Sequence, residues 1–116
     1  MAITSLKLKD FELKNPIMTA SGTYGYNDEY DEFINVSNIG AIVTKAISLK
    51  SRAGNKHTRI IETEAGMINS IGLENVGIDK FLTDKLPVLK GKNINFVMNI
   101  AGSTIEEYIE LAKICP

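Results

Sequence analysis

Residues 39–45 read Ile-Gly-Ala-Ile-Val-Thr-Lys, a short apolar run that a lysine ends. β-Branched residues without regular polar alternation are typical of a strand covered on both faces, as in a parallel sheet. Two further short apolar runs, residues 17–20 and 94–98, end at Ser21 and at Asn99. The three runs predict three strands, of which residues 39–44 form a buried one.

Helical patterns follow these strands. Asn27 is a favourable N-cap, and behind it three apolar residues recur at helical spacing. These are Tyr30, Phe33 and Ile34. Residues 78–89 predict a second helix, which is interrupted or ended near Pro87 because proline lacks the backbone donor.

A last helix begins near Ser103, which stands at the spacing of a capping box from Glu106. Its predicted apolar stripe consists of Ile105, Ile109 and Ala112, with Tyr108 and Leu111 beside it. Before the first strand, residues 5–8 and 11–14 alternate around a two-residue turn and predict a β-hairpin.

The repeat of strand and helix predicts an α/β fold with a parallel sheet. Right-handed crossovers place the helices on one side in a barrel or on both sides in an open sheet, and periodicity does not choose between the two. The length of 116 residues suits one domain, residues 1–116.

Composition excludes several classes of function. The chain is 44% hydrophobic and 23% charged with a formal net charge of −1, which argues against a nucleic-acid surface and a polybasic membrane patch. No apolar run approaches the ~20 residues of a membrane span. No secretory signal opens the sequence, and one cysteine cannot form an internal disulfide, so we expect a cytoplasmic protein.

Polar or flexible residues follow each predicted strand: Ser21 and Gly22, then Lys45, then Asn99. Ligands of parallel α/β folds collect at the carboxyl ends of the strands, so we expect these residues at one rim. Lys45 either extends to solvent or meets an anion, and its position leaves both open. Gly22 either admits a flat ligand or only turns the chain, and Asn99 offers hydrogen bonds to a ligand or to loop backbone.

Residues 46–77 are too long for an ordinary connection, which is typical of functional loops. Between residues 66 and 75, polar residues and glycines alternate with apolar ones without helical or strand periodicity. The Asn69 side chain and the backbone around Gly72 can bind a small anionic ring. An ordered loop that caps the sheet is the simpler interpretation.

Two reactive side chains form no site by pattern. Cys115 precedes Pro116 but falls at the end of the last helix, so we expect its thiol to serve packing or to be an accident of the terminus. His57 is the only histidine and lies in a basic loop without a second metal ligand nearby. We expect a solvated histidine and no metal site.

Taken together, four stretches resemble class 1B dihydroorotate dehydrogenase catalytic subunits across essentially the whole chain. They are residues 15–26 (Asn-Pro-Ile-Met-Thr-Ala-Ser-Gly-Thr-Tyr-Gly-Tyr), 44–46 (Thr-Lys-Ala), 62–75 (Glu-Thr-Glu-Ala-Gly-Met-Ile-Asn-Ser-Ile-Gly-Leu-Glu-Asn) and 99–103 (Asn-Ile-Ala-Gly-Ser). The third stretch is the most specific.

The resemblance implies the N-terminal portion of a TIM (β/α)8-barrel, with the hairpin and about three βα units. It implies FMN-dependent oxidation of (S)-dihydroorotate to orotate in de novo pyrimidine (UMP) biosynthesis, in which a base removes a C5 proton and hydride passes from C6 to FMN. Electrons then reach NAD⁺ through a partner subunit that carries FAD and a 2Fe-2S cluster, in a heterotetramer.

The roles of the family carry over by position. Flavin-binding positions match Ser21, Lys45, Ala46 and Asn99. Lys45 also matches a substrate-binding lysine, and the orotate-binding segment matches Asn69, Ser70, Ile71, Gly72 and Leu73. The catalytic cysteine of the family lies in a Ser-Cys-Pro-Asn motif after a further strand. Cys115 does not match it, so the resemblance implies no catalytic residue within the chain.

Two departures qualify the resemblance. Lys56 and Thr58 stand where the family usually has prolines, which concerns the stiffness of that loop. A barrel needs roughly 250 residues, so we expect a truncated catalytic subunit that is inactive alone. Two alternatives stay open: another FMN barrel that acts on a dihydropyrimidine or dihydrouridine, and a non-catalytic α/β module.

Overall fold

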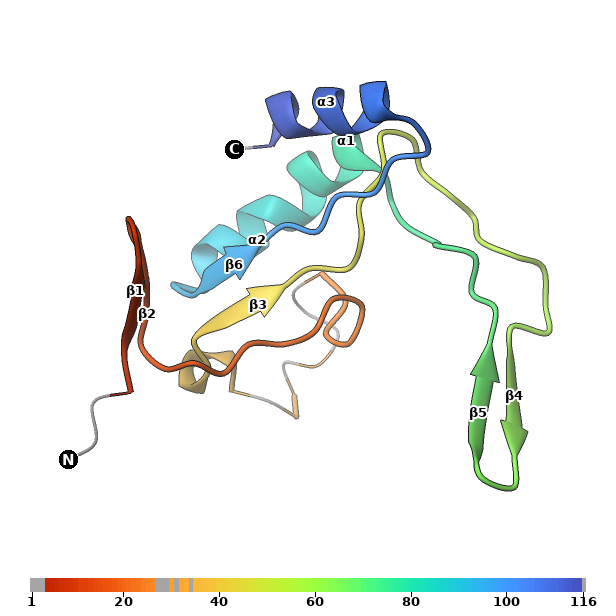
Figure 1. The fold of residues 1–116 in the computed structure, drawn as a ribbon, viewed down its shortest axis with the longest axis horizontal. Helices are drawn as coiled ribbons and strands as arrows, with labels where there is room; N and C mark the ends of the chain where they lie inside the picture. The colour runs from red at the N-terminus through yellow and green to blue at the C-terminus, as the bar shows by residue number, and fades with distance from the viewer. Residues whose placement is uncertain (1–3, 27–29, 31, 34, 116) are drawn as a thin grey trace.

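A computed structural model describes residues 4–26, 30, 32–33 and 35–115. Its elements are, in order, β1 (Leu6–Leu8), β2 (Phe11–Leu13), the 3₁₀ turn η1 (Val36–Asn38), β3 (Ala41–Val43), β4 (Ile60–Thr63), β5 (Gly66–Asn69), α1 (Ile78–Lys80), the π-helical η2 (Phe81–Lys85), α2 (Leu86–Gly91), β6 (Asn95–Val97) and α3 (Ile105–Ile114). Figure 1 shows β3 and β6 at the centre, with the β1–β2 hairpin on one side and an arm carrying β4 and β5 on the other.

The central strands are parallel, as predicted. β3 pairs with β6 from Ala41 opposite Asn95 to Val43 opposite Val97. The predicted strand at residues 17–20 is reduced to a parallel bridge between Met18 and Ala41. The Gly40 amide donates to the Ile17 carbonyl and the Thr19 amide to the Ala41 carbonyl, so three extended segments lie in the order 17–19, β3, β6.

The predicted hairpin is confirmed. β1 and β2 are antiparallel with Leu8 opposite Phe11. The hairpin lies where β3 and β6 begin, and the Asn95 side chain donates a hydrogen bond to the Glu12 carbonyl there. The hairpin and the arm therefore lie at opposite ends of the parallel strands.

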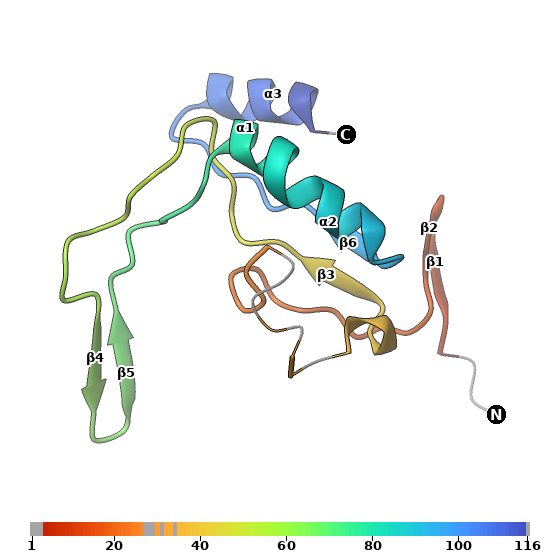
Figure 2. The same cartoon turned by 180° about the vertical axis from the view of Figure 1, so that it is seen from behind.

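The core lies between the two central strands and the helices. Seen from behind, the helical segment of residues 78–91 lies in front of β6, with β3 beyond its edge (Figure 2). Ile42, Phe81, Leu89 and Leu111 have no exposed surface and belong to one buried cluster. Burial of such side chains stabilises a fold by about 1.5–3 kcal/mol each.

The interruption predicted near Pro87 is confirmed and has a geometric cause. Residues 81–85 form a π-helical turn directly before Pro87, and helix α2 continues to Gly91. A proline in a regular helix clashes with the carbonyl four residues earlier and leaves that carbonyl without a donor. The wider π turn accommodates both changes without ending the segment.

The N-terminus of α3 lies one residue later than predicted. Thr104 is the N-cap, and its hydroxyl accepts a hydrogen bond from the Glu107 amide. The Glu107 carboxylate accepts from the Ser103 amide. The proposed Ser103–Glu106 box is therefore wrong. Hydrogen bonds from its own backbone amide and from the Thr104 hydroxyl lower the pKa of the Glu106 carboxyl below its usual value.

The predicted apolar stripe of α3 is also wrong. Ile105 and Ile109 are 74% and 49% exposed, and Ala112 is exposed as well, whereas Leu111 is fully buried. The helix contacts the core through a single turn near its end, so position relative to the sheet decides which face is covered.

The first predicted helix is not borne out where it can be followed. Asn27 and Ile34 lie outside the described residues. Tyr30 and Phe33 lie in a turn, which the Phe33 amide closes by donating to the Tyr30 carbonyl. Instead, the 3₁₀ turn η1 leads into β3, capped by the Asn35 side chain.

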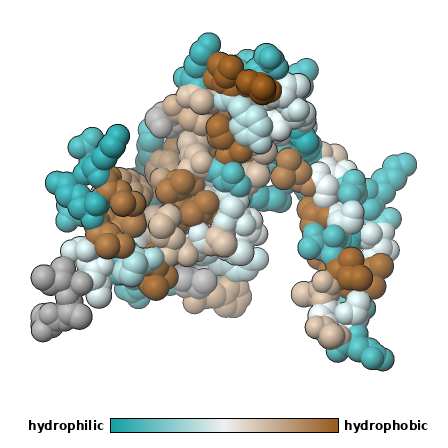
Figure 3. Space-filling model, viewed as in Figure 1, coloured by the Kyte–Doolittle hydropathy of each residue, from teal (hydrophilic) through white to brown (hydrophobic). Residues whose placement is uncertain are grey.

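Residues 60–69 form a hairpin that the sequence pattern did not predict. β4 and β5 are antiparallel, with Ile61 opposite Ile68. Ile60, Ile61, Met67 and Ile68 are all more than half exposed, and Figure 3 shows apolar surface on this arm. The interpretation of residues 66–69 as lacking strand structure is therefore wrong, although residues 70–77 contain no strand.

Within the described residues, no helix is long and apolar enough to cross a bilayer. The same residues contain no group of three or more histidine, cysteine or acidic side chains placed to hold a metal ion.

Candidate functional site

Side chains from three separate segments meet at the carboxyl ends of the parallel strands. The Ser21 hydroxyl donates to the Thr44 carbonyl at 2.9 Å and accepts from the Asn99 side-chain amide at 2.6 Å. The Asn99 backbone amide donates to the Thr44 hydroxyl at 3.1 Å. The predicted meeting of Ser21 and Asn99 at one rim is confirmed, with Thr44 between them.

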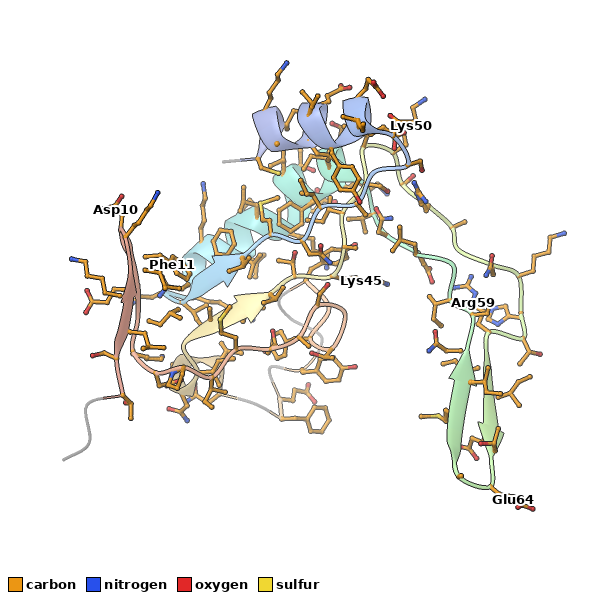
Figure 4. The ribbon with its side chains drawn as sticks, viewed as in Figure 1. Asp10, Phe11, Lys45, Lys50, Arg59 and Glu64 are labelled. Atoms are coloured by element: carbon orange, nitrogen blue, oxygen red, sulfur yellow. The ribbon has the colours of Figure 1, made fainter. Side chains whose placement is uncertain are left out.

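Lys45 follows Thr44 and projects from the carboxyl end of β3 (Figure 4). Its backbone amide donates to the Gly25 carbonyl at 2.8 Å, which fixes its position against the glycine-rich loop. The side chain is partly buried, and its ammonium group makes no hydrogen bond or ion pair with any residue that the structure describes. A partly buried cation without a protein partner is suited to bind an anionic or electron-rich group.

Ala46 follows Lys45, and the side chain of Tyr26 fixes its backbone. Its carbonyl accepts a 3.5 Å hydrogen bond from the hydroxyl of Tyr26, and that hydroxyl accepts from the Val76 amide at 3.3 Å. Tyr26 is 4% exposed and stacks at a tilt on Phe81. The glycine-rich loop thus supports the rim from the core.

The predicted substrate segment, Asn69 to Leu73, lies on the arm. Asn69 ends β5 opposite Ile60, and the Ser70 amide donates to the Arg59 carbonyl at 2.8 Å. Among described residues, no hydrogen bond or ion pair joins this segment to Ser21, Lys45 or Asn99. The structure brings the rim residues together and holds the segment separately.

Asn75 joins the end of this segment to the strand region. Its side-chain oxygen accepts from the Ser48 amide, the Ser48 hydroxyl and the Gly77 amide at 3.0–3.1 Å, and its amide donates to the Leu73 carbonyl. Asn75 is 5% exposed. The end of the segment is therefore anchored at Ser48, which lies three residues after Lys45 in the chain.

Sequence reasoning did not single out Thr44 or Arg59. Thr44 is fully buried, and the only sequence signal was a hydroxyl residue directly before the strand-end lysine. Arg59 forms an ion pair with Glu74 and reaches the Ala53 carbonyl at 3.0 Å. Two charges 15 residues apart in a long segment carry no pairing signal of their own.

The two reactive side chains set aside as non-site residues lie as expected. His57 is exposed in its loop. Cys115 packs against the core cluster behind Leu111, and desolvation there raises the pKa of its thiol above the usual value. The packing role predicted for Cys115 is confirmed.

Comparison with known proteins identifies the family of this chain. A family model described as dihydroorotate dehydrogenase matches residues 3–115. The chain is 50% identical over 109 residues to the protein of Geobacter sulfurreducens named dihydroorotate dehydrogenase B (NAD(+)), catalytic subunit. The aligned region covers 94% of this chain and 36% of that protein. The chain is 47% identical over 114 residues to the protein of the same name from Thermodesulfovibrio yellowstonii, with 98% and 38% covered.

The chain thus spans little more than a third of the length of these curated relatives. The match nevertheless covers nearly every residue, including the strand ends at Ser21, Lys45 and Asn99. The chain belongs to the dihydroorotate dehydrogenase family.

Proposed function

We propose that this chain forms part of a catalytic subunit that oxidises (S)-dihydroorotate to orotate with FMN, in pyrimidine biosynthesis. Family membership supports the reaction class, and the names of the relatives support NAD⁺ as the final acceptor. The observation that carries the proposal is the Ser21–Asn99 hydrogen bond at the carboxyl ends of the strands, together with the unpartnered ammonium group of Lys45, the residue that follows Thr44.

We further propose that residues 1–116 supply the hairpin and about three βα units of a (β/α)8 barrel, the first of them with a turn in place of its helix at the described residues Tyr30 and Phe33. The order of the parallel segments 17–19, β3 and β6 supports this, since consecutive strands of such a barrel are neighbours. The hairpin at the amino ends of the strands would close the bottom of that barrel.

The partner that we propose is an electron-transfer subunit with FAD and a 2Fe-2S cluster, in a cytoplasmic heterotetramer. The words "catalytic subunit" in the names of the relatives support the existence of a partner. Its cofactors rest on the family resemblance alone.

The residues at the rim fit a flavin. A Cβ built on Gly22 has no atom within 4 Å, and the φ angle of Gly22 is +79°, so a flat ring can lie close to this backbone. Lys45 supplies positive charge, and the Ser21–Asn99 pair supplies polar atoms at the ring edge. FMN, when bound, supplies the hydride acceptor. The chain's own residues hold and orient it.

Lys45 has a second task in this proposal. Orotate carries a carboxylate that uracil lacks, and a partly buried ammonium group favours a ligand with that charge. The proposal requires the arm segment Asn69–Leu73, which makes no hydrogen bond to the described rim residues in this structure, to approach Lys45 and offer its polar side chains and backbone groups to the same ring. No side chain of this chain is assigned as the base that removes the C5 proton.

The test uses a full-length barrel, made by joining these 116 residues to the remaining part of the Geobacter sulfurreducens relative and loading it with FMN. Orotate should perturb the flavin absorbance at concentrations at least about tenfold lower than uracil, a difference of about 1.4 kcal/mol. Lys45→Gln should remove this preference, and Lys50→Gln, a change of an exposed lysine beyond the rim, should retain it.

Each other outcome identifies an alternative. Equal binding of uracil and orotate would favour a dihydropyrimidine or dihydrouridine type of enzyme. Binding of neither, with a cooperative thermal transition and no flavin, would favour a non-catalytic module. The 116-residue chain alone, supplied with FMN, should not reduce dichloroindophenol with dihydroorotate.

A further inference from the structure

Asn55 holds the middle of the proposed substrate segment from outside. Its side-chain amide donates to the Ser70 carbonyl at 3.0 Å and to the Ser70 hydroxyl at 2.9 Å. Its backbone amide donates to the Ile71 carbonyl at 3.0 Å. One residue thus fixes two consecutive residues of the segment Asn69–Leu73.

The backbone at residues 54–55 lies so close to the backbone at residues 71–72 that neither Gly54 nor Gly72 can carry a side chain. A Cβ on Gly72 would lie 2.7 Å from the Asn55 backbone nitrogen and from its side-chain Cγ. A Cβ on Gly54 would lie 2.5 Å from the Ile71 carbonyl oxygen. Both glycines have φ angles above +70°, so both the conformation and the close approach require glycine here.

Asn55 is itself held in place. The Arg59 guanidinium donates to the Asn55 carbonyl and to the Ala53 carbonyl, and pairs with the Glu74 carboxylate. The Arg59 carbonyl accepts from the Ser70 amide. Hydrogen bonds and an ion pair therefore hold the arm on both sides of the segment. Asn55 is the residue that contacts the centre of the segment.

We infer that Asn55 is a positioning residue, which keeps Ser70 to Gly72 in the conformation that binds the pyrimidine ring. The inference rests on the proposed function. Asn55 and Ser70 are exposed, so their hydrogen bonds add little to global stability. What they restrict is the conformation of the segment, and a preordered segment binds its ligand at a smaller entropy cost than a mobile one.

The test compares Asn55→Asp with Asn93→Asp. Both changes add one negative charge, but Asn93 is exposed at the turn before β6, away from the arm. In Asn55→Asp the donor to Ser70 is lost and a carboxylate faces the Ser70 carbonyl. In the 116-residue chain, amide hydrogen exchange of a peptide covering residues 68–73 should become faster in Asn55→Asp only.

In the FMN-loaded full-length barrel, Asn55→Asp should raise the KM for dihydroorotate and the Kd for orotate about tenfold, or about 1.4 kcal/mol. The kcat should stay within about threefold, because only binding is lost. Gly72→Ala should raise KM similarly by pushing Asn55 away, and Asn93→Asp should leave both constants unchanged.

A merely structural role gives a different result. Loss of folded protein lowers the apparent kcat and leaves KM as it was, and that outcome would overturn the inference. Unchanged KM and unchanged exchange in Asn55→Asp would also overturn it. Failure of the proposed function is separate, since it appears in the unsubstituted barrel as an absence of orotate binding.

Discussion

The Asn99 side-chain amide donates a 2.6 Å hydrogen bond to the Ser21 hydroxyl, across 78 residues of sequence. The Ser21 hydroxyl in turn donates a hydrogen bond to the Thr44 carbonyl. Through these bonds the carboxyl ends of three parallel segments are tied at one rim. Lys45 follows Thr44 in the chain, and its backbone amide donates to the Gly25 carbonyl.

Ser21→Ala should break this link. The variant loses one donor and one acceptor, so the free energy of unfolding should fall by about 1 kcal/mol. In a nitrogen–proton correlation spectrum the Asn99 side-chain amide signals should shift. Thr23→Ala is the control, because the Thr23 hydroxyl donates to the Ala20 carbonyl within the same loop. Unshifted Asn99 signals in Ser21→Ala would contradict the described geometry.

Asn75→Ala should be strongly destabilising. The change removes the acceptor of the Ser48 and Gly77 amides in a buried setting, while the Ser48 hydroxyl keeps the Lys50 carbonyl as its acceptor. Unsatisfied buried groups cost about 1–3 kcal/mol each, so a loss of about 2–4 kcal/mol is expected in urea unfolding. Asn38→Ala, on an exposed residue of η1, should change stability by less than about 0.5 kcal/mol. Equal effects of the two variants would refute the role of Asn75 as an anchor.

Leu111→Ala tests how α3 is attached. Leu111 has no exposed surface, so truncation should cost about 2–5 kcal/mol. Ile105→Ala in the same helix removes a side chain that is 74% exposed and should cost less than about 1 kcal/mol. Thermal or urea unfolding measures both. A larger effect at Ile105 would restore the stripe predicted from the sequence.

Cys115 gives a prediction for pH dependence. Desolvation raises the pKa of its thiol, so the folded state disfavours the thiolate. Alkylation by iodoacetamide at pH 8 should therefore be slower in the folded chain than in urea. The midpoint of the plot of alkylation rate against pH should lie at a higher pH in the folded chain. Because the folded pKa is raised, the stabilisation is complete below the ordinary thiol pKa and is lost as pH rises through the folded value. Equal rates in both states would exclude desolvation of the thiol.

Local sequence patterns predicted the elements whose signals are short-ranged. The β1–β2 hairpin, strands β3 and β6 and the break at Pro87 each follow from alternation, β-branching or a missing donor within a few residues. The α3 cap was misplaced by one residue because Ser103 and Thr104 are both good caps, and the approach of the chain from β6 selects between them. The arm hairpin was missed because its turn, Glu64-Ala65, is not one of the glycine-containing dipeptides that mark a two-residue hairpin in sequence.

The sequence by itself determined that strand ends carry Ser21, Lys45 and Asn99, because residue order along each strand is a local property. Only the tertiary structure decided that Asn99 bonds Ser21, that Thr44 lies between them, and that Asn55 and Arg59 hold the segment from Asn69 to Leu73. Such contacts join residues 15 to 78 positions apart. They form only when the packing of β3, β6 and their helices has brought the strand ends and the arm into place, and no spacing rule along the chain encodes that packing.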